Sequence, residues 1–298
     1  MLSFKYVFYA ILISLITSSC QRLVDIDLSG ESQLVVSCFI SPDQKEVQLK
    51  LSQNQTVGSS GGLDASDFIV PDAIVKIENL QKGQEIELTF DTEHSLYSTI
   101  PPLGFLSPSD SFTLSIQHPD FPAVSGQCQI PAAPQQFAIQ LDSVTADGDP
   151  FPDFFCQTSW EDPAQERNYY RVIGKIIPSM QFFVNSDPWF FRWQGLSVDP
   201  DYLLDDNFDG QAVVGPTGDL QNVARNLNGV RPPRMPGDSL VVALLHVDEN
   251  YYRYMRDLRQ NRNVDLAFSE PYTIFSNLEG GIGIFAAYHA DEKRLQIR

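Results

Sequence analysis

One acidic stretch of the chain has the residue types and spacing of a metal-binding loop. Residues 205–210 read D-x-N-x-D-G through Asp205, Asn207 and Asp209, which is the start of a calcium-binding EF-hand loop. A complete loop ends in a Glu that binds Ca²⁺ through both carboxylate oxygens, and Pro216 occupies that position here. This excludes an EF-hand. The sequence favours an acidic turn, and the alternative is a weak calcium site formed by Asp205, Asn207 and Asp209.

A cluster of aromatic side chains between residues 182 and 193 is a second candidate. Trp189, Phe190 and Trp193 belong to this cluster, and Pro188 interrupts it as in a loop or hairpin tip. Packing in the core is the plainer interpretation of such rings. Exposed rings, however, stack on ligands or dock on partner proteins. We therefore predict that these three residues contact a ligand or a partner.

The tetrapeptide GDSL, which contains Ser239, is the nucleophile motif of an esterase family. A serine nucleophile needs an organised general base, and that family places an Asp three residues before its catalytic His. The residues three before His246 and His289 are Ala243 and Ala286. The sequence therefore indicates no catalytic residues, and we expect that the protein is not an enzyme.

The N-terminus predicts export and a lipid anchor. Lys5 precedes an apolar run of about half the 20 or so residues that a membrane-spanning helix needs. Small residues then lead to Cys20, although Thr17 stands where a Leu is usual before a lipidated cysteine. We predict a lipoprotein signal peptide at residues 1–19 and acylation of Cys20, with enough acyl chains for stable attachment to the membrane.

Charge and composition exclude several classes of partner. The chain of 298 residues has 38 acidic and 20 basic side chains, a formal net charge of −18. Such a balance argues against nucleic acid, whose phosphates need a basic surface, and against a polybasic membrane contact. Because 43% of the residues are hydrophobic, the chain can bury substantial cores.

The first half of the chain has the rhythm of a β-sandwich. Seven short segments with alternating apolar and polar residues, such as QLVVSCFI and QEIELTF, lie between residues 33 and 131. Seven strands in about 100 residues are typical of an immunoglobulin-like sandwich. We therefore predict such a domain over residues 20–131.

A change of pattern follows the linker PAAPQQ, residues 131–136. The later segments are longer and richer in aromatic residues, which predicts a β-rich C-terminal domain over residues 137–298. One long helix is expected in ENYYRYMRDLRQNR, with Asp248 as its N-cap and Tyr251, Tyr252, Met255 and Leu258 as apolar contacts. The predicted fold class is mainly β, with α+β character near the C-terminus.

Three cysteines remain besides Cys20. Cys38 and Cys128 lie in predicted strands, and a disulfide between them forms only if those strands are neighbours. Buried free thiols are the alternative, because cysteine also packs as a small hydrophobic residue. The spacing of Cys38, Cys128 and Cys156 does not resemble a zinc site.

The order of the motifs resembles a known family. The N-terminal cysteine motif, QLVVSCFI, PDAIVKI, the tyrosine-rich helix and FSEPYTIFSNLEGGIGIFAAY are similar to a family of Bacteroidota lipoproteins, domain of unknown function 4249. The resemblance covers nearly the whole chain. It implies an exported outer-membrane lipoprotein, often encoded beside a TonB-dependent transporter, and it implies no enzymatic activity. Gly280, Gly281 and Gly283 in the last motif predict a tight turn rather than a phosphate loop.

These observations lead to one expected function and two alternatives. We expect a binding or accessory lipoprotein of the outer membrane that assists nutrient uptake through a TonB-dependent transporter, with the face of the membrane left open. The aromatic segment or the acidic residues 199–210 would contact the transporter or its cargo. The alternatives are a cell-surface hydrolase that uses paired carboxylates and a structural adhesin module.

Overall fold

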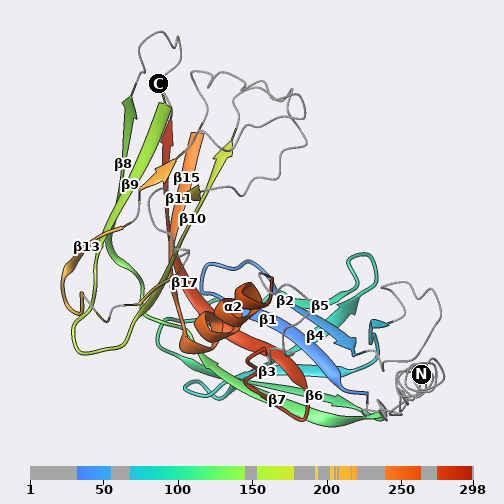
Figure 1. Ribbon diagram of the computed structural model, residues 1–298. Helices are drawn as coiled ribbons and strands as arrows, with labels where there is room; N and C mark the ends of the chain where they lie inside the picture. Colours follow the sequence, from blue (N-terminus) through green and yellow to red (C-terminus); the bar gives the residue numbers. More distant parts are fainter. Residues whose placement is uncertain are drawn as a thin grey trace, which may run out of the picture. The chain divides into compact units, whose positions relative to one another are not determined.

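A computed structural model describes residues 32–54, 68–144, 153–177, 192–193, 202–204, 206, 208–215, 217–219, 239–262 and 274–296 (Figure 1). Within these residues the chain is mainly β, with one α-helix near the C-terminus, as the sequence predicts. No helix in this part of the chain is long and apolar enough to cross a membrane.

The first seven strands form a β-sandwich. Their alternating burial confirms the predicted pattern, as in β1, where every second residue is buried. The strands are β1 (Leu34–Ile40), β2 (Val47–Gln53), β3 (Ile74–Asn79), β4 (Gln84–Asp91), β5 (Leu96–Thr99), β6 (Ser111–His118) and β7 (Phe121–Gln129).

Strand β4 links the two layers of this sandwich. Its last residues pair with β5, whereas its first five pair with β3. The sheet therefore folds over, and β1 and β2 lie across a common core from β3, β6 and β7 (Figure 1). Apolar side chains from both layers fill that core. Several of them have no exposed surface, for example Leu34, Val75 and Ile116.

Two strands from the end of the chain complete the sandwich. β16 (Leu278–Glu279) pairs with β7, and the first part of β17 (Ile282–Gln296) pairs in parallel with β1. Between them Gly280 has φ +77°, and Gly283, just inside β17, has φ +118°. A Cβ atom at Gly283 would collide with the backbone carbonyl of Val36, so only glycine allows this close approach.

A second pair of sheets shares a separate core. One sheet contains β8 (Gln135–Val144), β9 (Asp153–Glu161), β11 (Arg192–Trp193), β13 (Ala212–Val214) and β14 (Gly218–Asp219). The other contains β12 (Tyr202–Leu204), β10 (Tyr169–Ile177), β15 (Ser239–Val247) and the second part of β17. Side chains from both sheets meet in the core, among them Phe137, Trp160, Tyr170 and Leu244. The predicted division of the chain at residues 131–136 stays a prediction, and β17 contributes to both groups of strands.

Helix α2 (Glu249–Arg262) confirms the predicted helix and its cap. Asp248 Oδ1 accepts a hydrogen bond of 2.8 Å from the backbone N–H of Tyr251, as expected of an N-cap. Tyr251, Tyr252 and Met255 pack against residues of β10, β15 and β17, as predicted. Tyr254 packs against the same residues, a contact that is not predicted from the sequence.

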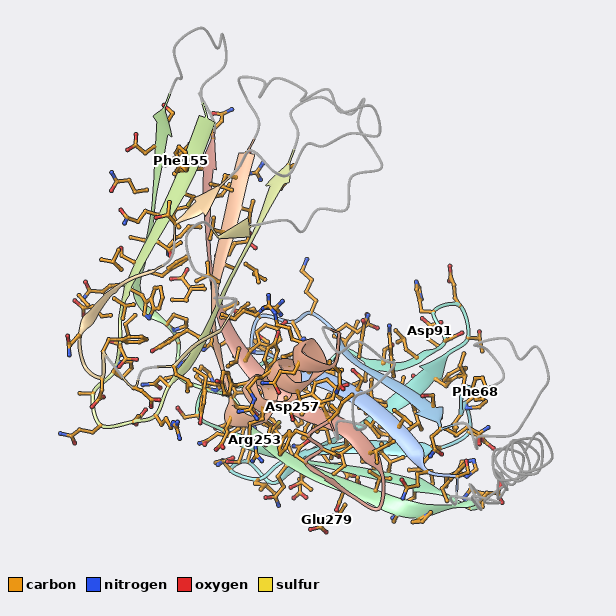
Figure 2. All side chains as sticks on the ribbon, in the orientation of Figure 1. Phe68, Asp91, Phe155, Arg253, Asp257 and Glu279 are labelled. Carbon is orange, nitrogen blue, oxygen red and sulfur yellow. The ribbon has the colours of Figure 1, made fainter. Side chains whose placement is uncertain are left out.

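Helix α2 also holds the segment before β16. Asp257 is buried and accepts a hydrogen bond of 3.1 Å from the backbone N–H of Phe275. The guanidinium of Arg253 lies 4.0 Å from the centre of the Phe275 ring, a cation–π contact. Arg253 and Asp257 both project from α2 (Figure 2). At least one arginine of the helix therefore has a structural role.

Asp248 also joins the helix to β17. Its backbone N–H donates to Ala287 O at 3.0 Å, and its Oδ2 accepts from Ala287 N at 3.1 Å. Desolvation of the carboxylate raises the pKa of Asp248 from 3.8 to about 8, against the opposing effect of backbone hydrogen bonds from Tyr251, Ala287 and Gln129.

The close approach at Gly283 generates a first prediction. Gly283→Ala should lower the free energy of unfolding by about 3 kcal/mol, because it combines a positive φ with a collision against Val36. Gly104→Ala is the matched control, since Gly104 has φ +77° but open space around its Cα, and should cost about 1 kcal/mol. Urea unfolding measures both values, and equal losses would show that β17 does not lie against β1 in this register.

The desolvated carboxylate of Asp248 generates a second prediction. Because its folded pKa lies above its unfolded pKa, the stability that it contributes is full at low pH and is lost as pH rises towards about 8. Asp248→Asn cannot ionise, so the stability of the wild-type protein relative to this variant should fall between about pH 5 and pH 8. Urea unfolding at several pH values measures this difference, and a difference independent of pH would contradict the raised pKa.

Candidate functional site

Of the three residues predicted to bind calcium, only Asp209 lies among the described residues. Asp209 lies in a turn formed by residues 208–210, and its Oδ1 accepts a hydrogen bond of 2.8 Å from the backbone N–H of Gln165. Asp205 and Asn207 lie outside the described residues. Asp209 therefore has a structural partner already, as the interpretation as an acidic turn expects. Calcium binding by the three residues stays a prediction.

The side chain of Asp162 holds this turn in place. It is only 6% exposed, and its Oδ2 accepts a hydrogen bond of 3.0 Å from the backbone N–H of Gly210. Its Oδ1 accepts a hydrogen bond of 2.8 Å from the hydroxyl of Tyr170. Gly210 has φ +68°, and a Cβ atom there would collide with Ala164. Asp162 is not among the residues predicted from the sequence, although the dipeptide Asp162-Pro163 is itself a turn signal.

A row of polar rings crosses three strands of the second pair of sheets. Tyr170 is opposite His246, and His246 is opposite His289. The rings of Tyr170 and His246 stack with their centres 5.0 Å apart. Because directly opposed residues in a sheet point to the same face, the three side chains form one continuous row.

The two histidines have different partners. His246 Nδ1 lies 2.9 Å from the backbone oxygen of Ala132, and burial lowers the pKa of His246 although that hydrogen bond raises it. His289 Nε2 lies 3.9 Å from a carboxylate oxygen of Asp43. His289 Nδ1 is buried and has no hydrogen-bond partner among the described residues. The row is thus a polar link inside the fold, with His246 held neutral by its surroundings.

Ser239 is not arranged as a nucleophile towards these histidines. Its hydroxyl lies 3.0 Å from Arg294 Nη2, which donates to it, and it stands opposite Gln296 at the end of the β15–β17 pair. His246 is seven residues further along the same strand, which is about 23 Å away. Ser239 therefore begins a buried strand, β15.

The aromatic candidate is described only in part. Trp193 lies in β11 and is opposite Gly218 of β14. Trp189 and Phe190 lie outside the described residues, as does Cys20. Contact of Trp189, Phe190 and Trp193 with a ligand or partner therefore stays a prediction.

The three cysteines among the described residues are buried thiols. Cys38, Cys128 and Cys156 are all free. Burial raises the pKa of Cys38 and of Cys156 to about 12, which keeps both thiols protonated and unreactive. Of the two alternatives, the structure therefore has free thiols. In the described part of the chain, no three His, Cys, Asp or Glu side chains are grouped so that they could hold a metal ion.

The acidic turn generates a third prediction. Asp162→Ala should lower the free energy of unfolding by about 2–4 kcal/mol, because it leaves two donors of a buried network without their acceptor. Asp209→Ala removes one exposed hydrogen bond and should cost about 1 kcal/mol. Thermal or urea unfolding compares the two variants. If Asp209→Ala instead cost more than Asp162→Ala, and Ca²⁺ stabilised the wild-type protein but not the Asp209→Ala variant, the result would support a calcium site.

Comparison with known proteins identifies the family of this chain. A comparison with curated proteins found no match. Residues 22–294 match the family described as domain of unknown function (DUF4249), a match that includes every strand and the helix described above apart from the last two residues of β17. Since the match covers nearly the whole chain, the protein belongs to the DUF4249 family.

Proposed function

We propose that the protein is an outer-membrane lipoprotein of a Bacteroidota bacterium. The observation that carries this proposal is the short apolar run that ends in small residues and Cys20. The first described strand, β1, begins at Leu34. A lipid on Cys20 would hold this β-rich body at a membrane surface through the chain between them.

Its proposed activity is that of a binding or accessory subunit in nutrient uptake through a TonB-dependent transporter. Attachment to the same membrane raises the effective concentration of the protein towards such a transporter, so a weak contact is sufficient. The family resemblance supports this partner, because related lipoproteins are often encoded beside such transporters.

The contact residues proposed for this role are Trp189, Phe190 and Trp193, together with the acidic residues 199–210. Aromatic rings dominate the energy of many protein interfaces, which supports the first group. The second group has Asp209 in a turn that is fastened to Asp162 and Gln165, so at least this part of the segment has a fixed conformation.

Lipidation generates a fourth prediction. Cys20→Ala should release the protein from the membrane fraction, because the sequence offers no other predicted anchor. Ser19→Ala is the matched control, since it changes the neighbouring small residue without removing the acylated thiol, and should remain bound. Fractionation after a carbonate wash, with immunoblotting, measures both. A Cys20→Ala protein that still sediments with membranes would show that the anchor lies elsewhere.

The partner is tested by copurification from native membranes. A C-terminal affinity tag on the lipidated protein should retain a TonB-dependent transporter, identified by mass spectrometry. Retention of no transporter, under conditions in which the tagged protein is itself recovered from the outer membrane, would reject the proposed role in uptake.

A further inference from the structure

Strand β8 leaves one long edge of its sheet unpaired. It pairs with β9 along one side, and no other described strand pairs with its opposite side (Figure 1). The other strands at sheet edges in the described part of the chain, β11, β12, β13 and β16, have two or three residues each, whereas β8 has ten. A long edge with free backbone groups is a template for a further strand.

The features that block strand addition are nearly absent from this edge. Proteins protect exposed edges with Lys, Pro, bulges or inward-pointing charges. From Ala138 to Val144, β8 has no Lys, Arg or Pro, and its only charged residue is Asp142. The irregularity in its pairing with β9 lies between Gln135 and Ala138, before this stretch. The stretch from Ala138 onwards is therefore regular and open to a partner strand.

The backbone groups that point out of this edge belong to Ile139 and Leu141. On the far side of β9, the N–H of Gly215 donates to Thr158 O at 2.8 Å, so the backbone groups of Thr158 point away from β8. Ile139 is directly opposite Thr158. In an antiparallel pair, opposed residues either bond each other or both point away, so the N–H and C=O of Ile139 point outwards. The direction alternates along a strand, which gives Leu141 the same orientation.

The side chains of the same two residues leave the second core incompletely covered. Ile139 and Leu141 are partly buried and pack against the core that contains Trp160 and Leu244. The alternate residues, Ala138 and Gln140, are exposed on the opposite face. A strand that adds to this edge with apolar residues at every second position would cover the remaining apolar surface of Ile139 and Leu141.

Strand β8 itself has the pattern that its edge requires. We propose that β8 pairs in antiparallel orientation with β8 of a second copy of this chain, with Gln140 on the two-fold axis. Ile139 is then opposite Leu141 of the second copy, and the reverse pair is equivalent by symmetry. Both residues present outward N–H and C=O groups, so the two pairs form four backbone hydrogen bonds. Their apolar side chains lie on the same face and continue the core across the axis. This inference does not depend on the proposed role in uptake.

The charges of the edge agree with this register. Asp142 is opposite Ala138 of the second copy, so the two Asp142 carboxylates do not face each other. The net charge of −18 on each chain opposes association, but that repulsion acts over long distances and is screened by salt. Pairing through backbone groups and apolar side chains is not screened. The dimer should therefore become stronger as the salt concentration rises.

The first test measures self-association of the full-length protein in detergent micelles that are in excess over the chains. Sedimentation equilibrium should give a dissociation constant below about 100 µM. Association should strengthen as NaCl rises from about 0.05 M to 0.5 M. Amide hydrogen exchange at Ile139 and Leu141 should slow as the protein concentration rises, because the dimer bonds both groups.

The second test changes the charge opposite Asp142. Ala138→Lys creates two attractive pairs across the axis and Ala138→Glu two repulsive ones, so the dissociation constants of these variants should differ at least about fivefold. Asp142→Lys in the Ala138→Glu background should restore association. Residues 138 and 142 of one strand are about 13 Å apart, so this rescue needs a second copy. Ala123→Lys and Ala123→Glu are the matched controls, since Ala123 is an exposed alanine of β7, and should differ little.

Each contrary outcome overturns the inference. A protein that stays monomeric up to about 0.5 mM does not pair through β8. A dimer that responds equally to the changes at Ala138 and at Ala123, or that leaves exchange at Ile139 and Leu141 unchanged, uses another surface. Slow exchange at these two amides that appears only after a membrane extract is added would assign the edge to a strand of a different protein. Because Ala138 is exposed, its variants should keep the melting temperature of the wild-type protein, which excludes unfolding as the cause.

Discussion

The position of β17 is the constraint on which the rest of the fold depends. Its first six residues pair in parallel with β1, and the nine that follow pair antiparallel with β15. One uninterrupted strand of 15 residues therefore supplies hydrogen-bond partners to strands that begin at residues 34 and 239. Without β17, an edge of β1 and an edge of β15 would each have unpaired backbone groups. Strands β1 and β15 therefore depend on the C-terminal strand β17 for backbone hydrogen bonds.

Polar side chains secure this arrangement at the points where strands and helix meet. Asn277 is an example, because its side chain bonds the backbone N–H and C=O of Phe285 at 3.0 Å and 2.7 Å and also donates to Gln127 O at 2.9 Å. Asp248 does the same between α2 and Ala287. Since a backbone group removed from water needs a partner, these side chains satisfy groups that the sheet cannot pair by itself.

The same use of polar side chains to fix the backbone connects the fold to the proposed role. The described carboxylates and amides that are most buried mainly hold loops and turns, as Asn79 holds the turn after β5 through Phe105 O. Surfaces that such networks fix in one conformation can bind a partner with little loss of entropy. A protein held at a membrane by lipid would gain from this, because confinement already provides a high effective concentration.

Local patterns in the sequence determined the strands, the helix and the turns. Alternating apolar residues predicted β1 and the strands that follow, Asp248 and the tyrosines predicted α2, and Asp209-Gly210 predicted a turn, because each of these signals acts within a few residues. Only the tertiary structure determined which strands and side chains are neighbours. The pairing of β17 with β1, the row from Tyr170 through His246 to His289, and the buried acceptor Asp162 join residues that are far apart in the sequence. Cross-strand register depends on the whole sheet and not on any local segment, so no spacing of residues in the sequence could reveal these contacts.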